Sequence, residues 1–170
     1  MTRFFIIFFM LFQLTNSFYS ENNSELFYSN VIRIARESVG MKYFPSIQGR
    51  SFTSDCIGFV RYVYQKSGLD LYKAYGEGRG GVSSLYDGLE KFGFVYDSKT
   101  ALPGDLIFFD NTYDVNRNGK WDDPLSHIGI VTGYGKHGTI EYIHFGSGFV
   151  NSDNINLYYP NTHAFKQKKN

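Results

Sequence analysis

The chain carries, at residues 54–64, the stretch SDCIGFVRYVY, which decides the fold around it. Asp55 is a residue type that caps helix N-termini, and apolar residues follow it at helical spacing. The pattern predicts a helix from Cys56 to about Gln65. Cys56 then lies in the first turn, where unpaired backbone N–H groups and the positive end of the helix dipole favour a thiolate.

Cys56 is the only cysteine of the chain, and two histidines occupy strand-like positions further on. His127 lies in the stretch SHIGIV and His144 in YIHFG. A lone cysteine with distant histidines is a candidate thiol-enzyme site. The alternative is a structural cysteine buried in the core.

The first residues predict export. Arg3 precedes an unbroken apolar run, residues 4–12, and small or polar residues follow at 15–17. This is the layout of a secretory signal peptide, which we place at residues 1–17. The alternative is an uncleaved N-terminal anchor, although the run is shorter than the roughly 20 residues of a membrane span. After cleavage we expect no membrane span and a periplasmic or extracellular location.

The charge balance of the chain argues against nucleic-acid binding. Without Arg3, the chain has 16 basic residues, which equals its 16 acidic residues. A nucleic-acid partner is therefore excluded, because it requires a basic surface. The basic residues 161–170 are interpreted as a solvated tail.

One cysteine cannot form an internal disulfide, and an unpaired thiol outside the cytoplasm is prone to oxidation. A chemical role for the thiol is therefore favoured.

The order of secondary structure predicts an α+β fold. Helical patterns come first, at 24–40, 56–65 and 82–92, and short apolar strands follow at 106–109, 127–132 and 139–145, with weaker ones near 150 and 157. Residues 24–160 form one domain. The stretch GEGRGG, residues 76–81, matches a dinucleotide fingerprint, but no strand precedes it, so we interpret it as a loop near the active site.

Four motifs occur in a fixed order. They are DCIGFV at 55–60, PGDLIFF at 103–109, HIGIV at 127–131 and IH at 143–144. In order and spacing they resemble the NlpC family (the NlpC and p-sixty superfamily) of cell-wall cysteine peptidases, over about residues 31–150. The resemblance implies a papain-like α+β fold, with the nucleophile helix packed on a small antiparallel sheet. It also implies a cysteine peptidase that hydrolyses amide bonds of peptidoglycan stem peptides. We expect this peptidase to be exported and wall-associated, to require no cofactor and to be a monomer. The bond implied is the amide between D-glutamate and a diamino acid of the stem peptide.

Carried over to this sequence, the resemblance makes Cys56 the nucleophile, His127 the general base and His144 the residue that orients the base. Tyr43, with the backbone N–H of Cys56, is implied to polarise the substrate carbonyl; the alternative is a packing tyrosine, one of 14 in the chain. We assign Asp55, next to the nucleophile, to the same substrate-binding and oxyanion side of the site as Tyr43.

Two departures from the family pattern lie near the substrate. Ile57 stands where the family usually has serine, and residues 44–49 replace the usual glycine pair. Both leave the cysteine chemistry intact and leave the substrate open. Three functions therefore remain: an endopeptidase, an amidase or acyltransferase on the same fold, and a non-catalytic wall-associated protein.

A second motif, residues 114–123, places oxygen-bearing groups at every second position, with Gly119 where a calcium loop turns sharply. The candidate ligands are Asp114, Asn116, Asn118, the Lys120 carbonyl and Asp122. The twelfth position is Leu125, where an EF-hand has glutamate, so this is not an EF-hand. Two interpretations stay open: a free-standing structural calcium loop and an Asn/Asp-rich turn.

Overall fold

The computed structural model describes residues 4–7, 17–76, 80–92, 94–96, 101–156 and 158. Its helices are α1 (Ser17–Glu37), α2 (Cys56–Lys66), α3 (Leu71–Tyr75) and α4 (Val82–Lys91). Its strands are β1 (Phe4–Ile7), β2 (Val95–Tyr96), β3 (Leu106–Phe109), β4 (His127–Tyr134), β5 (Thr139–Gly146) and β6 (Phe149–Asn156), with one 3₁₀ turn, η1 (Lys136–Gly138). The predicted α+β class is confirmed.

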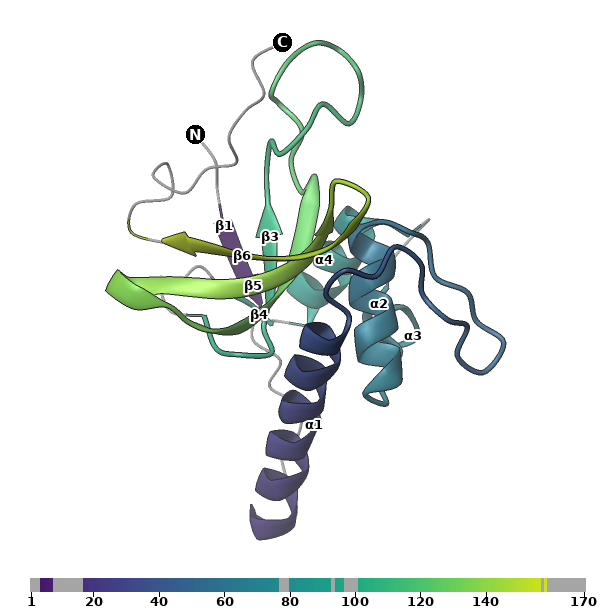
Figure 1. Cartoon of the computed structure of the whole chain (residues 1–170), viewed down its shortest axis with the longest axis vertical. Coiled ribbons are helices and arrows are strands. Elements are labelled where there is room, and N and C mark those ends of the chain that lie inside the picture. The colour runs from purple at the N-terminus through teal and green to yellow at the C-terminus, as the bar shows by residue number, and fades with distance from the viewer. Residues whose placement is uncertain are drawn as a thin grey trace.

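The described strands form one antiparallel sheet in the order β2-β1-β3-β4-β5-β6. The helices gather on one side of it (Figure 1). Strands β3 to β6 follow one another along the chain and in space, because antiparallel neighbours need only short connections. The exception is the 17-residue loop from Asp110 to Ser126 between β3 and β4.

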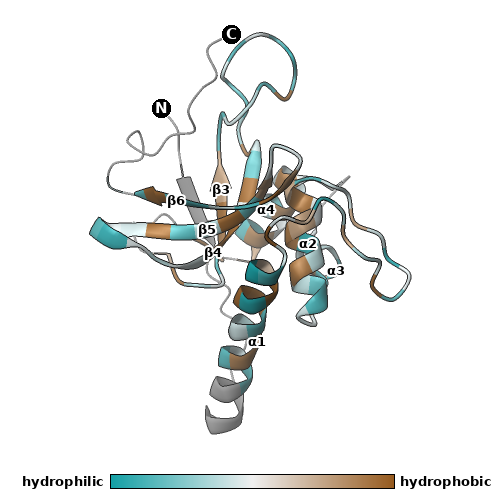
Figure 2. Ribbon diagram, viewed as in Figure 1, coloured by the Kyte–Doolittle hydropathy of each residue, from teal (hydrophilic) through white to brown (hydrophobic). Residues whose placement is uncertain are grey.

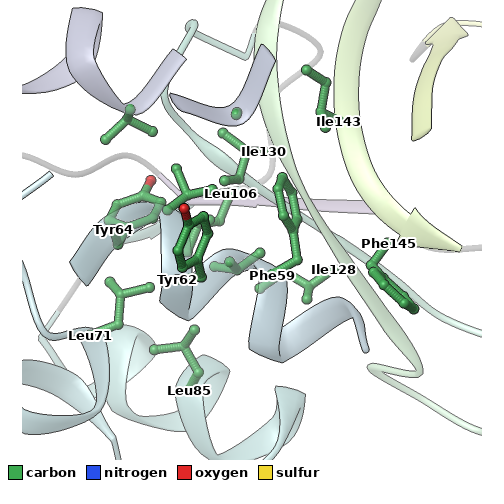
Figure 3. Close-up of a cluster of buried hydrophobic side chains, with 14 of the residues drawn as sticks. Phe59, Tyr62, Tyr64, Leu71, Leu85, Leu106, Ile128, Ile130, Ile143 and Phe145 are labelled. Carbon is green, nitrogen blue, oxygen red and sulfur yellow. The ribbon is translucent and has the colours of Figure 1, made fainter. Parts of the chain in front are cut away.

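Helix α2 lies at the centre of the larger core. Phe59, Val60, Val63 and Tyr64 are fully buried, and Figure 3 shows this helix face against side chains of the sheet such as Leu106, Ile128 and Ile143. Figure 2 shows brown and teal residues on α1 and α2, as expected for helices with one buried face. The Tyr64 hydroxyl donates to the carbonyl of Gly104 at 2.6 Å, which ties α2 to the turn before β3.

A second, smaller core lies on the other face of the sheet. Its buried members include Ile107, Phe109, Val131 and Tyr142, and no helical residue belongs to it among the described residues. Residues alternate between the two faces of a strand, so His127 and His144 share the face of Val131 and Tyr142. The two histidines therefore lie beside this smaller core.

Some elements differ from the sequence-based expectation. Helix α1 begins at Ser17 rather than at Ser24, because no glycine or proline interrupts the residues between them. The short α3 and the two-residue β2 were not predicted, because five and two residues carry too little periodicity.

Strand β1 falls within the segment predicted to be a signal peptide. Phe4 pairs with Phe109 and Ile7 with Leu106. Removal of residues 1–17 remains a prediction, because pairing in the intact chain does not report on processing. The rest of the apolar run, residues 8–12, and the tail, 161–170, lie outside the described residues. Among the described residues, no helix has the length and apolar character required to cross a bilayer.

Candidate active site

Cys56 is the first residue of α2, as predicted. The Asp55 side chain caps the helix by accepting the Gly58 N–H at 2.7 Å, and the Thr53 hydroxyl donates to the same carboxylate at 2.8 Å. A Cβ at Gly58 would lie 1.9 Å from the Thr53 carbonyl oxygen, so only glycine fits there. The motif DCIGFV is thus a helix start whose cap and close approach fix the position of the cysteine.

The thiol of Cys56 is not activated in the resting protein. Burial raises the pKa of the Cys56 thiol to about 11, and the negative charge of Asp55 acts in the same direction. Backbone hydrogen bonds from Ile128, Ile57 and Cys56 itself oppose this rise in the pKa. The expectation of a stabilised thiolate is therefore wrong, because burial and the capping carboxylate outweigh the helix N-terminus. The contact with Ile128 brings the sulfur to β4, one residue after His127.

His127 and His144 form a buried pair. His127 Nε2 lies 2.7 Å from His144 Nδ1, and the rings meet edge to face with centroids 4.9 Å apart. Only 7% of His127 and 3% of His144 are exposed. Burial, and then the neighbouring His144, lowers the pKa of His127 to about 3; burial also lowers the pKa of His144. Both rings are therefore neutral at pH 7, so His127 is in the protonation state that a general base needs.

Two glycines make room for the ring of His144. Gly129 is directly opposite His144 in the β4–β5 pairing, and a Cβ there would lie 3.3 Å from the His144 Cβ and 3.0 Å from the Tyr142 ring. A Cβ at Gly146 would lie 2.9 Å from the His144 Cε1. These contacts explain why glycine occupies the third position of HIGIV, two residues after His127. Gly129 belongs to the sequence motif, but only the strand register shows that its missing side chain leaves room for His144 and Tyr142.

We expect Gly129→Ala to separate the two histidines. The added methyl would push on the His144 and Tyr142 side chains, and a misplaced orienting residue lowers activity about 10²-fold. The hydrolytic rate of the purified variant, relative to the wild type, measures this. Gly138→Ala is the control, since a Cβ there meets nothing within 4 Å, although its positive φ of 74° adds some strain. Wild-type activity in Gly129→Ala would contradict the spacing argument.

The long loop before β4 is held closed at its base. The Leu125 N–H donates to Asp110 Oδ1 at 2.8 Å, and the Thr112 N–H donates to the Ser126 hydroxyl at 2.9 Å. Within this loop, Tyr113 is 51% exposed. Burial raises the pKa of Tyr113, and the nearby charges of Cys56 and Asp55 raise it further, which places its hydroxyl in the field of the thiol. Sequence reasoning missed this residue, because one tyrosine among 14 carries no motif.

The glycine-rich segment is pinned close to α2. The Tyr72 hydroxyl accepts the Gly81 N–H at 2.5 Å and donates to the Gly81 carbonyl at 2.7 Å. The Arg61 guanidinium lies 4.4 Å from the centroid of the Tyr72 ring. Burial raises the pKa of Tyr72, while the hydrogen bond to Gly81 and the charge of Arg61 act in the opposite direction. The contact of Tyr72 with Arg61 ties the described end of this segment to α2, and its place beside the active site stays a prediction.

Tyr43 and Asp55, which the sequence assigns to the substrate side of the site, differ in exposure and in hydrogen bonding. Tyr43 is 77% exposed and makes no hydrogen bond or ring contact with the described residues, so its role towards the carbonyl stays a prediction. Asp55 uses its carboxylate to cap α2, which gives it a structural role in the resting protein.

The candidate calcium loop is a compact polar turn. Asp114 accepts the N–H groups of Asn118 and Gly119 at 3.1 and 2.8 Å. The Asn118 side chain accepts the Lys120 N–H at 2.8 Å and donates to Asp122 at 3.0 Å. Among the described residues, no three His, Cys, Asp or Glu side chains group around a possible metal position. Calcium binding therefore stays a prediction.

Comparison with known proteins places the chain in a family. The NlpC/P60 family model matches residues 41–169. The chain belongs to the NlpC/P60 family, and the resemblance seen in its motifs is confirmed.

The related proteins are larger. The chain is 29% identical over 106 residues to the "Probable endopeptidase p60" of Listeria innocua, covering 62% of this chain and 18% of that protein. It is 28% identical over 110 residues to the "Bifunctional muramidase/DL-endopeptidase CwlT" of Bacillus subtilis, covering 65% of this chain and 28% of that protein. The chain thus spans less than a third of the length of these relatives. No solved structure matches it significantly.

Proposed function

We propose that the protein is a peptidoglycan hydrolase that cleaves an amide bond of the stem peptide by thiol catalysis. The observation that carries the proposal is the 2.7 Å contact between His127 and His144 at the start of β4, where the Cys56 sulfur meets the N–H of Ile128. Family membership and the endopeptidase names of the relatives support the substrate class. We propose further that the bond lies between D-glutamate and a diamino acid; the printed name of the Bacillus subtilis relative, which includes a DL-endopeptidase, supports an endopeptidase activity.

The histidine contact assigns the proton positions. To act as a base through Nδ1, neutral His127 carries its proton on Nε2 and donates it to His144 Nδ1. His127 Nδ1 then removes the proton of the Cys56 thiol as the sulfur attacks the amide carbonyl. The C–N bond breaks, the leaving amine takes the proton from His127, and a thioester remains on Cys56. Water activated by His127 hydrolyses the thioester and restores the thiol.

The raised pKa of the Cys56 thiol and the lowered pKa of His127 make transfer of the thiol proton to His127 unfavourable before substrate binds. We infer that proton transfer accompanies attack on the carbonyl. Stabilisation of the developing oxyanion by backbone N–H groups at the start of α2 would offset its cost.

Digestion of purified peptidoglycan tests the proposal. Mass analysis of the released fragments should show new termini within the stem peptide with the wild type and none with Cys56→Ala. Cleavage between sugar and peptide would make the protein an amidase, and transfer to an added amine would make it an acyltransferase. The absence of any cleavage product would favour the non-catalytic alternative.

We propose that the chain is exported and acts at the cell wall, since its substrate lies there. Arg3 and the apolar run after it support a signal peptide. Amino-terminal sequencing of the protein from its cell should begin near Phe18. A cytoplasmic product that retains Met1 would refute export.

We propose that the 114–123 loop binds structural calcium, as its ligand spacing predicts. The loop leads into the strand of His127. An ion bound only to the folded state stabilises that state, so calcium should raise the melting temperature. At a hundredfold excess over the dissociation constant the stabilisation is about 2.7 kcal/mol. Magnesium should act less, and Asp114→Ala should remove the calcium effect. Equal melting curves with calcium and with chelator would leave the loop as a polar turn.

A further inference from the structure

We propose that Asp153 on β6 is a further positioning residue of the site, placed to stabilise the proton that His127 and His144 share. This inference rests on the proposed function, in which the histidine pair accepts the proton of the thiol. Asp153 belongs to none of the four sequence motifs, and no chemical pattern along the chain marks it.

The strand register brings Asp153 to His144. In the β5–β6 pairing, Tyr142 is opposite Asp153 and His144 is opposite Asn151. Residues two apart on a strand share a face, so all four side chains lie on the same face of the sheet. Asp153 is thus the diagonal neighbour of His144, and diagonal neighbours on antiparallel strands are within reach of longer side chains.

Electrostatics agrees with this placement. The charge of Asp153 raises the pKa of His144 against the larger lowering by burial, and it raises the pKa of Tyr142, its direct partner across the strands. The Asp153 carboxylate is half-buried, where a charge is less screened than at an exposed site.

Three further described neighbours of His144 are uncharged at neutral pH. His127 contacts it at 2.7 Å from β4, and the Tyr142 ring centroid lies 5.2 Å away on β5. The Asn151 amide donates to the carbonyls of Gly146 and Phe149, at 2.6 and 2.8 Å, and so holds the β5–β6 turn. Among these neighbours, Asp153 is the group whose charge can offset a positive charge on the pair.

The chemical consequence follows from proton transfer. When His127 takes the proton of the thiol, positive charge develops on a ring hydrogen-bonded to His144. A carboxylate close to His144 stabilises this charge by Coulomb attraction through a medium that is less polar than water. The arrangement extends the site from Cys56 through two histidines to Asp153, so that a neutral, buried histidine pair still functions as a base.

Asp153→Asn tests the inference, because it removes the charge at nearly constant size. We expect the His144 titration midpoint, followed by NMR of the ring, to fall by about half a unit to one unit. The acid limb of kcat/KM should move in the same direction, since loss of a negative charge disfavours the imidazolium. The plateau of kcat/KM should fall about three- to tenfold, and Asp153→Glu should restore most of it.

Glu141→Gln is the matched control. Glu141 lies on the same strand as His144, its side chain is exposed and on the face opposite that of His144, and its substitution removes the same charge. It should leave both the His144 titration and the rate profile unchanged. If Asp153→Asn and Glu141→Gln behave alike, Asp153 has no special action on the pair and the inference is overturned. The NMR titration needs no substrate, so it decides the role of Asp153 even if the wild type fails to cleave peptidoglycan, a result that would instead refute the proposed function.

Discussion

Cys56→Ser is expected to abolish cleavage of peptidoglycan, and His127→Ala is expected to lower kcat/KM by about 10²–10⁴-fold. The hydroxyl of serine is a much weaker nucleophile next to a base of such low proton affinity, and without His127 nothing removes the proton of the thiol. The two residues act as one unit, so the double variant should be no worse than the more damaging single one. Rates of fragment release by purified variants measure this.

His144 offers an internal comparison in the same assay. His144→Ala should retain more activity than His127→Ala, because water can replace an orienting group in part. His144→Asn should retain more still, since its amide oxygen can accept the His127 N–H in place of His144 Nδ1, and loss of a buried hydrogen bond costs about 1–3 kcal/mol. Melting curves show whether each variant is folded. Full turnover by Cys56→Ser would refute the nucleophile assignment.

The reaction of Cys56 with iodoacetamide is expected to be slow at pH 7 and to rise about tenfold per pH unit up to about pH 10. The sign follows from the raised pKa of the thiol, about 11: the thiolate is the reactive form, and its fraction grows as the pH approaches that value. At pH 7 the thiolate fraction is on the order of one in ten thousand. Because Cys56 is the only cysteine, the label reports this thiol alone.

Two variants separate the causes of the raised pKa. Asp55→Asn removes the second-largest contribution and keeps a capping side chain, so it should speed the reaction at neutral pH. His127→Ala should leave the profile of the resting thiol nearly unchanged, because burial and Asp55 are the leading causes. A rate that is fast and independent of pH between 5 and 8 would instead show a thiolate–imidazolium pair and would contradict the resting state described here.

The helix that carries Cys56 could be predicted because its information is local. Asp55 caps the first turn, Gly58 permits the approach to Thr53, and the apolar spacing of Phe59, Val60 and Val63 directs one face to the core. The same holds for β3 to β5, whose short apolar runs lie between turn residues. Strand β6 (Phe149–Asn156) is a single, largely polar strand where two weak ones near 150 and 157 were expected, because its sequence has little apolar alternation. The elements with little local signal, α3 and β2, were not predicted, and the start of α1 was placed seven residues too late.

The sequence by itself therefore determined which residues are the candidates for the chemistry: one cysteine at a helix start, two strand histidines and the order of the motifs around them. Only the tertiary structure decided their state. The proton affinity of Cys56 and of His127 depends on burial and on neighbouring charges, which no spacing along the chain encodes. The contact of His127 with His144, and the approach of Asp153, depend on the pairing of three strands, in which a slip of one residue would turn every side chain to the other face.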